Sequence, residues 1–148
     1  MTLGRPVVSL VISMETASAI RRTAAVVTVS DGVAAGVRDD ASGAALTEIL
    51  EQSGFAVERR EVVPDEADLI ATLLRALIDA NIPLVVTTGG TGLGPRDVTP
   101  EATRTVVDRE APGLAEAMRA TGRGETPFAA LSRGVVGSRG STLVVNLP

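Results

Sequence analysis

The sequence of 148 residues contains no histidine, cysteine, tyrosine, tryptophan or lysine, so all 14 of its basic residues are arginine. The chain therefore has no imidazole base, thiolate nucleophile, Schiff-base amine or phosphate-loop lysine of its own. Carboxylates, hydroxyls, guanidinium groups and backbone amides remain. The oxygen atoms of the carboxylates, hydroxyls and backbone carbonyls would bind a hard cation, and Mg²⁺ fits best. This inventory suits reactions that depend on positioning and charge neutralisation, such as phosphoryl and nucleotidyl transfer.

Aromatic residues and long apolar runs are also scarce. Phe55 and Phe128 are the only aromatic residues, and the formal net charge is −4. We therefore expect no binding to nucleic acid or to an anionic membrane. No apolar run approaches the ~18 residues of a membrane span, and the run 7–12 after Arg5 is too short to favour a signal peptide. We interpret residues 1–22 as an N-terminal extension, and the lack of cysteine is compatible with the cytoplasmic location that we expect.

Apolar and polar segments alternate in a pattern typical of an α/β protein. The length and the 45% apolar content are those of one domain with a sizeable core. Strand–helix alternation predicts a mostly parallel sheet with helices on both faces. The expected strands are 24–29, 55–63, 82–88 and 141–147, and the expected helices are 42–52, one from about 66 to Asn81, 101–109 and 112–120.

The most informative segment is the glycine-rich stretch 87–100, T-T-G-G-T-G-L-G-P-R-D-V-T-P. It connects the third expected strand to a helix whose start, Thr99–Pro100–Glu101, has a capping hydroxyl, proline and an acid. A glycine-rich turn before a helix exposes backbone N–H groups toward an anion. Four glycines in positions 89–94 are costly to order, which favours a ligand-binding role. The segment matches neither the Walker loop nor the dinucleotide-binding fingerprint.

Polar residues follow each of the first three expected strands. Ser30 and Asp31 follow the first, Asp65 follows the second, and Arg96 and Asp97 lie in the glycine-rich stretch after the third. Ligands of parallel sheets bind beyond the carboxyl ends of the strands, so these residues are candidates for a common site. Periodicity alone does not show that these ends are neighbours in space.

Several of these residues also have simpler interpretations, which the sequence leaves open. Asp65 could cap the helix that follows it, Asp97 could be a turn residue, and Ser30–Asp31 could form a strand-ending turn. For Asp39–Asp40 we favour a helix cap, and for Arg133 and Arg139 we favour solvation, although Ser132–Arg133–Gly134 could help to bind an anion.

The glycine-rich stretch, read as T-T-G-G-T-G-x-x-P-R-D-V-T-P-E-A-T over 87–103, resembles the signature of the molybdopterin adenylyltransferase family of the MogA and MoaB type, which includes plant Cnx and gephyrin G domains. Further segments resemble this family in the same order, and the resemblance covers about residues 23–148. These segments are T-V-S-D at 28–31, D-x-S-G at 40–43, V-V-P-D-E at 62–66, P-G-L at 112–114, L-S-R-G at 131–134 and T-L-V-V-N-L-P at 142–148.

The resemblance implies a three-layer α/β sandwich with a mostly parallel central sheet, assembled as a homotrimer. It also implies Mg²⁺- and ATP-dependent adenylylation of molybdopterin, in which the terminal phosphate of the pterin attacks the α-phosphate of ATP. The products would be adenylyl-molybdopterin and pyrophosphate, and the former would pass to a molybdate-insertion protein.

The family's functional residues can be carried over to matching positions. The two aspartates needed for activity match Asp65 and Asp97, which we expect to be catalytic and to hold Mg²⁺ with the triphosphate. The residues expected to bind phosphate or pterin are Gly89, Gly90, Thr91, Gly92, Ser132 and Arg133. The residues expected to contact the nucleotide are Ser30, Asp31, Arg96, Asn146 and Pro148.

The chain departs from the family pattern at both ends. Family members continue beyond the position of Pro148 with a G-S-P-like loop and a further helix, so we expect the domain 23–148 to lack this C-terminal tail. Residues 1–22 have no counterpart. Alternative functions are a MoaB-type protein that binds pterin or nucleotide without catalysis, a trimeric scaffold, and a generic anion- or nucleotide-binding module.

Overall fold

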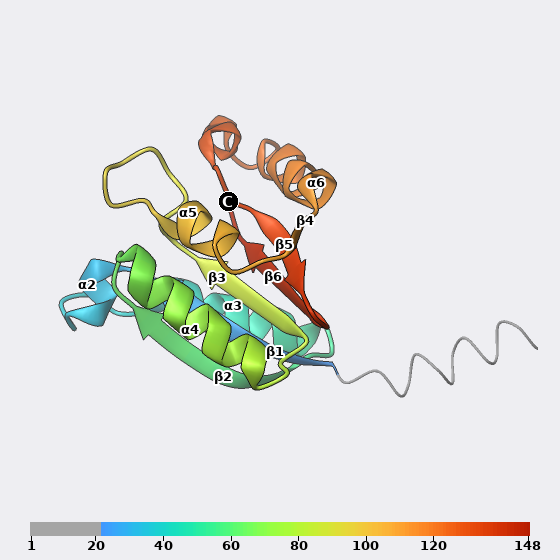
Figure 1. Cartoon of the computed structure of the whole chain (residues 1–148). Coiled ribbons are helices and arrows are strands. Elements are labelled where there is room, and N and C mark those ends of the chain that lie inside the picture. Colours follow the sequence, from blue (N-terminus) through green and yellow to red (C-terminus); the bar gives the residue numbers. More distant parts are fainter. Residues whose placement is uncertain (1–21) are drawn as a thin grey trace, which may run out of the picture.

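The computed structural model of the chain describes residues 22–148, so the expected N-terminal extension and its apolar run 7–12 lie almost wholly outside the described residues. The described part contains a six-stranded sheet with the order β2-β1-β3-β6-β5-β4 (Figure 1). The strands β2, β1, β3 and β6 are parallel, whereas β5 and β4 are antiparallel to their neighbours. The strands are β1 (Thr23–Val29), β2 (Ala56–Val63), β3 (Leu84–Thr88), β4 (Arg109–Glu110), β5 (Val136–Arg139) and β6 (Thr142–Asn146).

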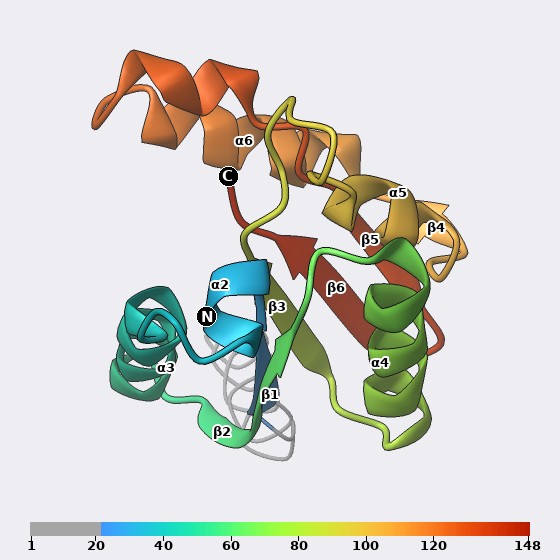
Figure 2. The same cartoon turned by 90° about the vertical axis from the view of Figure 1, so that its left-hand side faces the viewer.

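Helices cover both faces of the sheet, which makes three layers. Helix α3 (Ala41–Gln52) packs on one face, and α4 (Ala67–Asp79) and α5 (Thr99–Arg104) pack on the other (Figure 2). The central strand β1 is buried along its whole length, so its side chains alternate between the two cores. The predicted three-layer sandwich with a mostly parallel sheet is confirmed.

Helix α4 illustrates how the sequence produces this packing. Ile70, Leu74 and Leu77 recur at helical spacing and are fully buried against the sheet. Burial of each such side chain contributes about 1.5–3 kcal/mol relative to exposure. The helix ends at Asp79, and the following turn places Asn81 in the left-handed region with φ 58°. The expected stop at this residue is therefore confirmed.

The region after the glycine-rich stretch differs from our expectation. The helix predicted over 101–109 ends at Arg104, because the chain turns there, buries Val106 and then forms the short strand β4. Strand β5 was not predicted, since residues 134–140 contain three glycines and a serine. Gly137 faces the carbonyl of Arg109, where a Cβ atom would lie only 2.8 Å away, so glycine lets β4 approach β5.

Three further elements complete the described chain. The short helix α2 (Asp31–Ala34) follows β1, α6 (Pro112–Gly122) confirms the helix expected over 112–120, and the 3-10 helix η1 (Pro127–Leu131) follows α6. Among residues 22–148, no helix is long and apolar enough to cross a membrane.

Candidate functional site

The loops after β1, β2 and β3 meet at one end of the sheet, because these strands are parallel and adjacent in the order β2-β1-β3. Figure 2 shows α2, the loop between β3 and α5, and the C-terminus at this end. The loops enclose a cavity of about 650 Å³, which we call the polar cleft. Its lining contains Thr28, Val29, Ser30, Val33, Arg38, Asp39, Asp40, Ala41, Ser42, Asp65, Thr88, Gly89, Gly90 and Asp97.

Asp31 and Asp65 are linked to each other by two hydrogen bonds. The Asp31 N–H donates to Asp65 Oδ2 at 2.8 Å, and the Asp65 N–H donates to Asp31 Oδ1 at 3.0 Å. Helix α4 begins at Ala67 without a side-chain cap, so Asp65 is not its capping residue. The capping interpretation of Asp65 is therefore wrong, and its carboxylate instead ties the end of β2 to the end of β1.

The Arg96 guanidinium connects the glycine-rich stretch to the same pair. Arg96 Nε donates to Asp31 Oδ2 at 2.5 Å, and Nη2 donates to Asp31 Oδ1 at 3.0 Å. This hydrogen-bonded ion pair and the N–H of Asp65 hold the pKa of Asp31 below its ordinary value. Both side chains are largely exposed, and neither lines the polar cleft. In this arrangement Asp31 and Arg96 bind each other at its rim.

The first two glycines of the stretch have backbone conformations that exclude other residues. Gly89 and Gly90 have φ values of 96° and 69°. A Cβ atom at Gly89 would collide with the Val29 carbonyl, and one at Gly90 would collide with the Thr99 hydroxyl. The Thr99 hydroxyl donates to the Gly89 carbonyl at 2.9 Å instead of capping α5, so the predicted capping role of Thr99 is wrong.

Asp97 lies at the end of the stretch and faces the polar cleft. Its Oδ2 accepts the Gly94 N–H at 2.8 Å, and the Asp97 N–H donates to the Gly94 carbonyl at 3.1 Å. A Cβ atom at Gly92 or Gly94 would lie 2.9 Å from Oδ2, so these glycines make room for the carboxylate. Asp97 thus has the expected turn role, and its carboxylate also lines the cleft.

Four carboxylates line the cleft, those of Asp39, Asp40, Asp65 and Asp97, and the last two are those expected to hold Mg²⁺. Within residues 22–148, no group of three or more acidic side chains is placed to hold a metal ion. Mg²⁺ usually binds one or two carboxylates together with substrate phosphates. The residues present therefore fit an Mg²⁺ ion that is shared with a bound polyphosphate.

The cleft lining also contains Arg38, which the sequence did not single out. Arg38 Nη2 donates to Ser30 Oγ at 2.8 Å, which places a cation inside the cleft. Only its position in a loop before a helix could have indicated this role. Asp40 caps α3 through the Gly43 N–H at 2.9 Å, so the predicted cap at Asp39–Asp40 is confirmed. Partial burial raises the pKa of Asp40, but hydrogen bonds from Arg60, Thr28 and the Gly43 N–H outweigh it and hold this pKa below the ordinary value.

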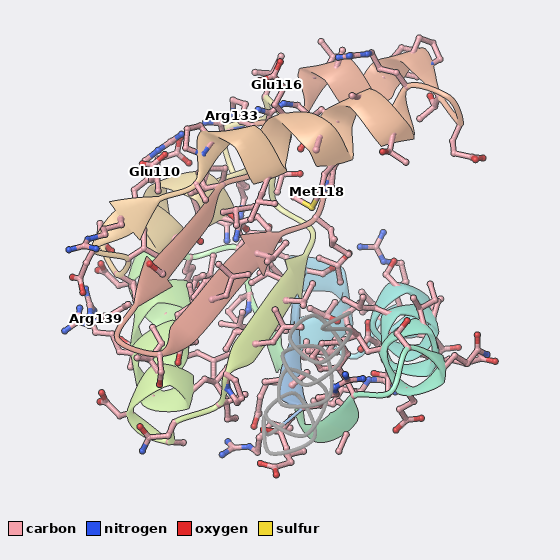
Figure 3. The ribbon with its side chains drawn as sticks, turned by 90° about the vertical axis from the view of Figure 1, so that its right-hand side faces the viewer. Glu110, Glu116, Met118, Arg133 and Arg139 are labelled. Carbon is pink, nitrogen blue, oxygen red and sulfur yellow. The ribbon has the colours of Figure 1, made fainter. Side chains whose placement is uncertain are left out.

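Other predicted ligand residues lie on the far side of the glycine-rich stretch. Thr91, Gly92, Ser132 and Pro148 line a second cavity of about 1280 Å³, which we call the apolar groove. It lies between α6, η1, α3 and the strands β5 and β6. The sulfur of Met118 points from α6 toward these strands, whereas Glu116 points away (Figure 3). The other apolar residues that line the apolar groove are Ile49, Leu114, Ala117, Phe128, Ala129, Leu131, Val136, Leu143, Val145 and Leu147. The predicted set is thus divided between two cavities, with Gly89 and Gly90 on one side and Thr91 and Gly92 on the other.

Asn146 lies in the interior. Its side chain is fully buried, donates to Thr87 Oγ1 and Thr103 Oγ1 at 3.0 Å each, and accepts the Val135 N–H at 3.1 Å. Every polar atom of the amide therefore has a protein partner. The nucleotide contact expected for Asn146 stays a prediction, and this arrangement argues against it.

Comparisons with known proteins agree with this architecture. Residues 25–148 match the sequence model of a family described as "Probable molybdopterin binding domain". A Helicobacter pylori protein named molybdopterin adenylyltransferase is 43% identical over 126 residues, covering 83% of this chain and 72% of that protein. The Drosophila melanogaster molybdenum cofactor synthesis protein cinnamon is 42% identical over 85% of this chain, which spans only 21% of it. A crystal structure of the molybdopterin biosynthesis enzyme MoaB from Thermus thermophilus is 51% identical with a TM-score of 0.80, covering 85% of this chain and 80% of that one.

Proposed function

Because this chain belongs to the family of probable molybdopterin binding domains, we propose that it is a molybdopterin adenylyltransferase of molybdenum cofactor biosynthesis. Relatives that carry this name are 41–45% identical to it. The observation that carries the proposal is the polar cleft, where Asp65 and Asp97 face the open backbone of Gly89 and Gly90. The substrates are ATP and molybdopterin, and the products are adenylyl-molybdopterin and pyrophosphate.

The residues of the cleft have separate roles in this reaction. The backbone around Gly89 and Gly90 receives phosphate oxygens, since both glycines line the cleft. The Arg38 guanidinium, which also lines the cleft, neutralises further negative charge. Asp65 and Asp97 would hold Mg²⁺ with the triphosphate, and the ion would supply charge neutralisation.

The reaction needs no protein side chain that titrates near neutral pH. The attacking group is the terminal phosphate of molybdopterin, which is already ionised, and the leaving group is pyrophosphate. The main obstacles are repulsion between anions and their alignment, which fixed dipoles and bound cations reduce. Alignment of two bound reactants contributes on the order of 7–11 kcal/mol. A chain without histidine, cysteine or lysine can therefore carry out this transfer.

The direct test is AMP transfer to molybdopterin. Purified protein, molybdopterin, ATP and Mg²⁺ are incubated, and adenylyl-molybdopterin is identified by mass. We expect product with the unmodified chain and none with Asp97→Asn, which keeps an oxygen acceptor for the Gly94 N–H but removes the charge. Molybdopterin binding by Asp97→Asn should persist. Binding of molybdopterin without product in the unmodified chain would instead favour a non-catalytic binding protein.

The assembly and the cellular setting are part of the same proposal. The family resemblance supports a homotrimer in the cytoplasm that passes its product to a molybdate-insertion protein. Light scattering of the purified chain tests the trimer, because a mass of 15.1 kDa per chain separates the monomer from a threefold assembly. A monomer that retains full transfer activity would contradict the trimer without affecting the reaction.

A further inference from the structure

Arg133 donates three hydrogen bonds to backbone carbonyls of the glycine-rich stretch. Its Nε donates to the Gly92 carbonyl at 2.8 Å, and Nη2 donates to the Asp97 carbonyl at 2.7 Å. Its backbone N–H also donates to the Thr91 carbonyl at 2.9 Å. The third guanidinium nitrogen, Nη1, binds the carboxylate of Glu101 in the first turn of α5. One side chain therefore joins both ends of the segment 92–97 to the start of the next helix.

We propose that Arg133 is a positioning residue that holds Asp97 at the polar cleft, with Glu101 holding Arg133 in turn. The assignment rests on the proposed function, because it concerns the carboxylate expected to bind Mg²⁺ and ATP. It replaces the expected role of Arg133 as a direct contact to phosphate or pterin.

The position of Arg133 supports this assignment. The side chain does not line the polar cleft but a separate cavity of about 310 Å³, together with Arg104, Glu110 and Arg119. Figure 3 labels Arg133 and Glu110 on this side of the molecule, near α6. Each of the three guanidinium nitrogens donates a hydrogen bond to a protein acceptor, and these bonds direct the group toward the glycine-rich stretch and Glu101. The hydrogen bond from Arg133 holds the pKa of Glu101 below its ordinary value, so this carboxylate stays charged.

The shape of the guanidinium group explains why arginine stands here. Its planar fork offers several N–H donors in fixed directions, so it can hold two carbonyls and a carboxylate at once. A lysine ammonium has similar charge but no fixed fork. The substitution Arg133→Lys therefore separates two roles, because a phosphate contact needs mainly charge, whereas a positioning role needs the fork.

The experiment compares Arg133→Lys, Arg133→Ala and Glu101→Gln in the full chain. Adenylyl transfer is measured over ranges of Mg²⁺–ATP and molybdopterin, and hydrogen exchange of the amides of residues 92–97 is measured without ligands. We expect both Arg133 variants to lose about 10–100-fold in kcat/KM for Mg²⁺–ATP, the usual effect of removing a group that orients a metal ligand. Exchange of the Gly94 and Asp97 amides should become faster, and Glu101→Gln should change both quantities in the same direction by less.

The matched control is Arg59→Lys, which alters an arginine–carboxylate pair on the edge strand β2, between Arg59 and Glu61. It should leave transfer and the exchange of residues 92–97 unchanged. Circular dichroism establishes that each variant is folded. If Arg133→Ala does not fold, Arg133→Lys and Glu101→Gln still test the role.

Three results would overturn the assignment. If Arg133→Lys is fully active while Arg133→Ala is inactive, the charge of Arg133 contacts the substrate directly. Tighter ATP binding by Glu101→Gln would show the same, since that variant frees the arginine from its carboxylate partner. Unchanged exchange of residues 92–97 in both Arg133 variants would also contradict a positioning role. If the unmodified chain forms no adenylyl-molybdopterin but exchange responds as expected, the proposed function fails while the contact network stands.

Discussion

The two cavities beside the glycine-rich stretch differ in chemistry although they share one wall. The polar cleft is lined by four carboxylates, one arginine and glycine backbone, whereas the apolar groove is lined mainly by leucine, valine, alanine and methionine. The chain changes sides between Gly90 and Thr91. Gly89 and Gly90 take left-handed backbone angles at this point, which allows the reversal.

This difference shows that neighbouring residues of one motif need not serve one ligand. Thr91 follows Gly90 directly, but its hydroxyl lies near the Leu147 carbonyl and Ser132 Oγ, at 3.5 and 3.4 Å. Charged phosphates are expected on the cleft side, where the glycine backbone and the Arg38 guanidinium lie. The predictions below test this separation.

The largest effect is expected from Asp65→Asn. The variant keeps an oxygen that can accept the Asp31 N–H but removes the charge expected to bind Mg²⁺, so transfer should fall by about 10²–10³-fold with little change in Tm. Steady-state kinetics and thermal unfolding measure the two quantities. The control on the groove side is Phe128→Ser, an exposed position whose replacement should leave the kinetics for ATP unchanged. Equal losses of transfer activity in both variants would show that the two cavities do not have separate roles.

The next effect is expected from Gly90→Ala. The added methyl group meets the Thr99 hydroxyl, and the φ of 69° is unfavourable for alanine, so the free energy of unfolding should fall by about 1–3 kcal/mol. Transfer should fall as well, because the backbone expected to bind phosphate shifts. Gly113→Ala is the control, since it lies in α6 with open space around it and should be neutral or slightly stabilising. A fully active and stable Gly90→Ala would contradict the observed turn.

A comparable loss of stability is expected from Asn146→Leu, with a different kinetic result. The substitution leaves the buried Val135 N–H without its acceptor, so the free energy of unfolding, measured with urea, should fall by about 1–3 kcal/mol. The KM for ATP of the folded variant should not change, because the amide faces the interior. A raised KM for ATP with unchanged stability would instead support the nucleotide contact that the sequence analysis predicted for Asn146.

The smallest effect concerns acid stability. Asp31, Asp40 and Glu101 have pKa values below their ordinary values of 3.8, 3.8 and 4.5, because each is hydrogen-bonded to an arginine. Their contribution to stability is complete above these ordinary values and is lost as the pH falls through the lower, folded-state pKa values. Urea unfolding should therefore show constant stability from pH 7 to about 5.5 and a decline below about 4. A decline between pH 7 and 5.5 would be unexpected, since the chain has no histidine.

Much of the fold was predictable because it depends on local patterns. The β-branched run of β1 and the apolar stripe of α4 indicated their own structure, and the alternation of such segments indicated a parallel sheet. Strand β5 was missed because it is short and Gly137 lowers its strand propensity, while pairing with β6 stabilises it. The helix predicted to reach residue 109 was also too long, since pairing of Arg109–Glu110 with β5 competes with helix formation.

The sequence by itself determined which chemistry is possible and which family the chain resembles. The absence of imidazole, thiol and amine side chains, the four glycines and the order of the motifs are visible without coordinates, and the family and the fold inferred from them are confirmed. The tertiary structure decided which residues meet. It brought Asp65 and Asp97 together, tied Asp31 to Arg96, buried Asn146 and turned Arg133 toward the loop carbonyls. These outcomes depend on contacts between residues tens of positions apart, and local propensity and spacing contain no information about such contacts.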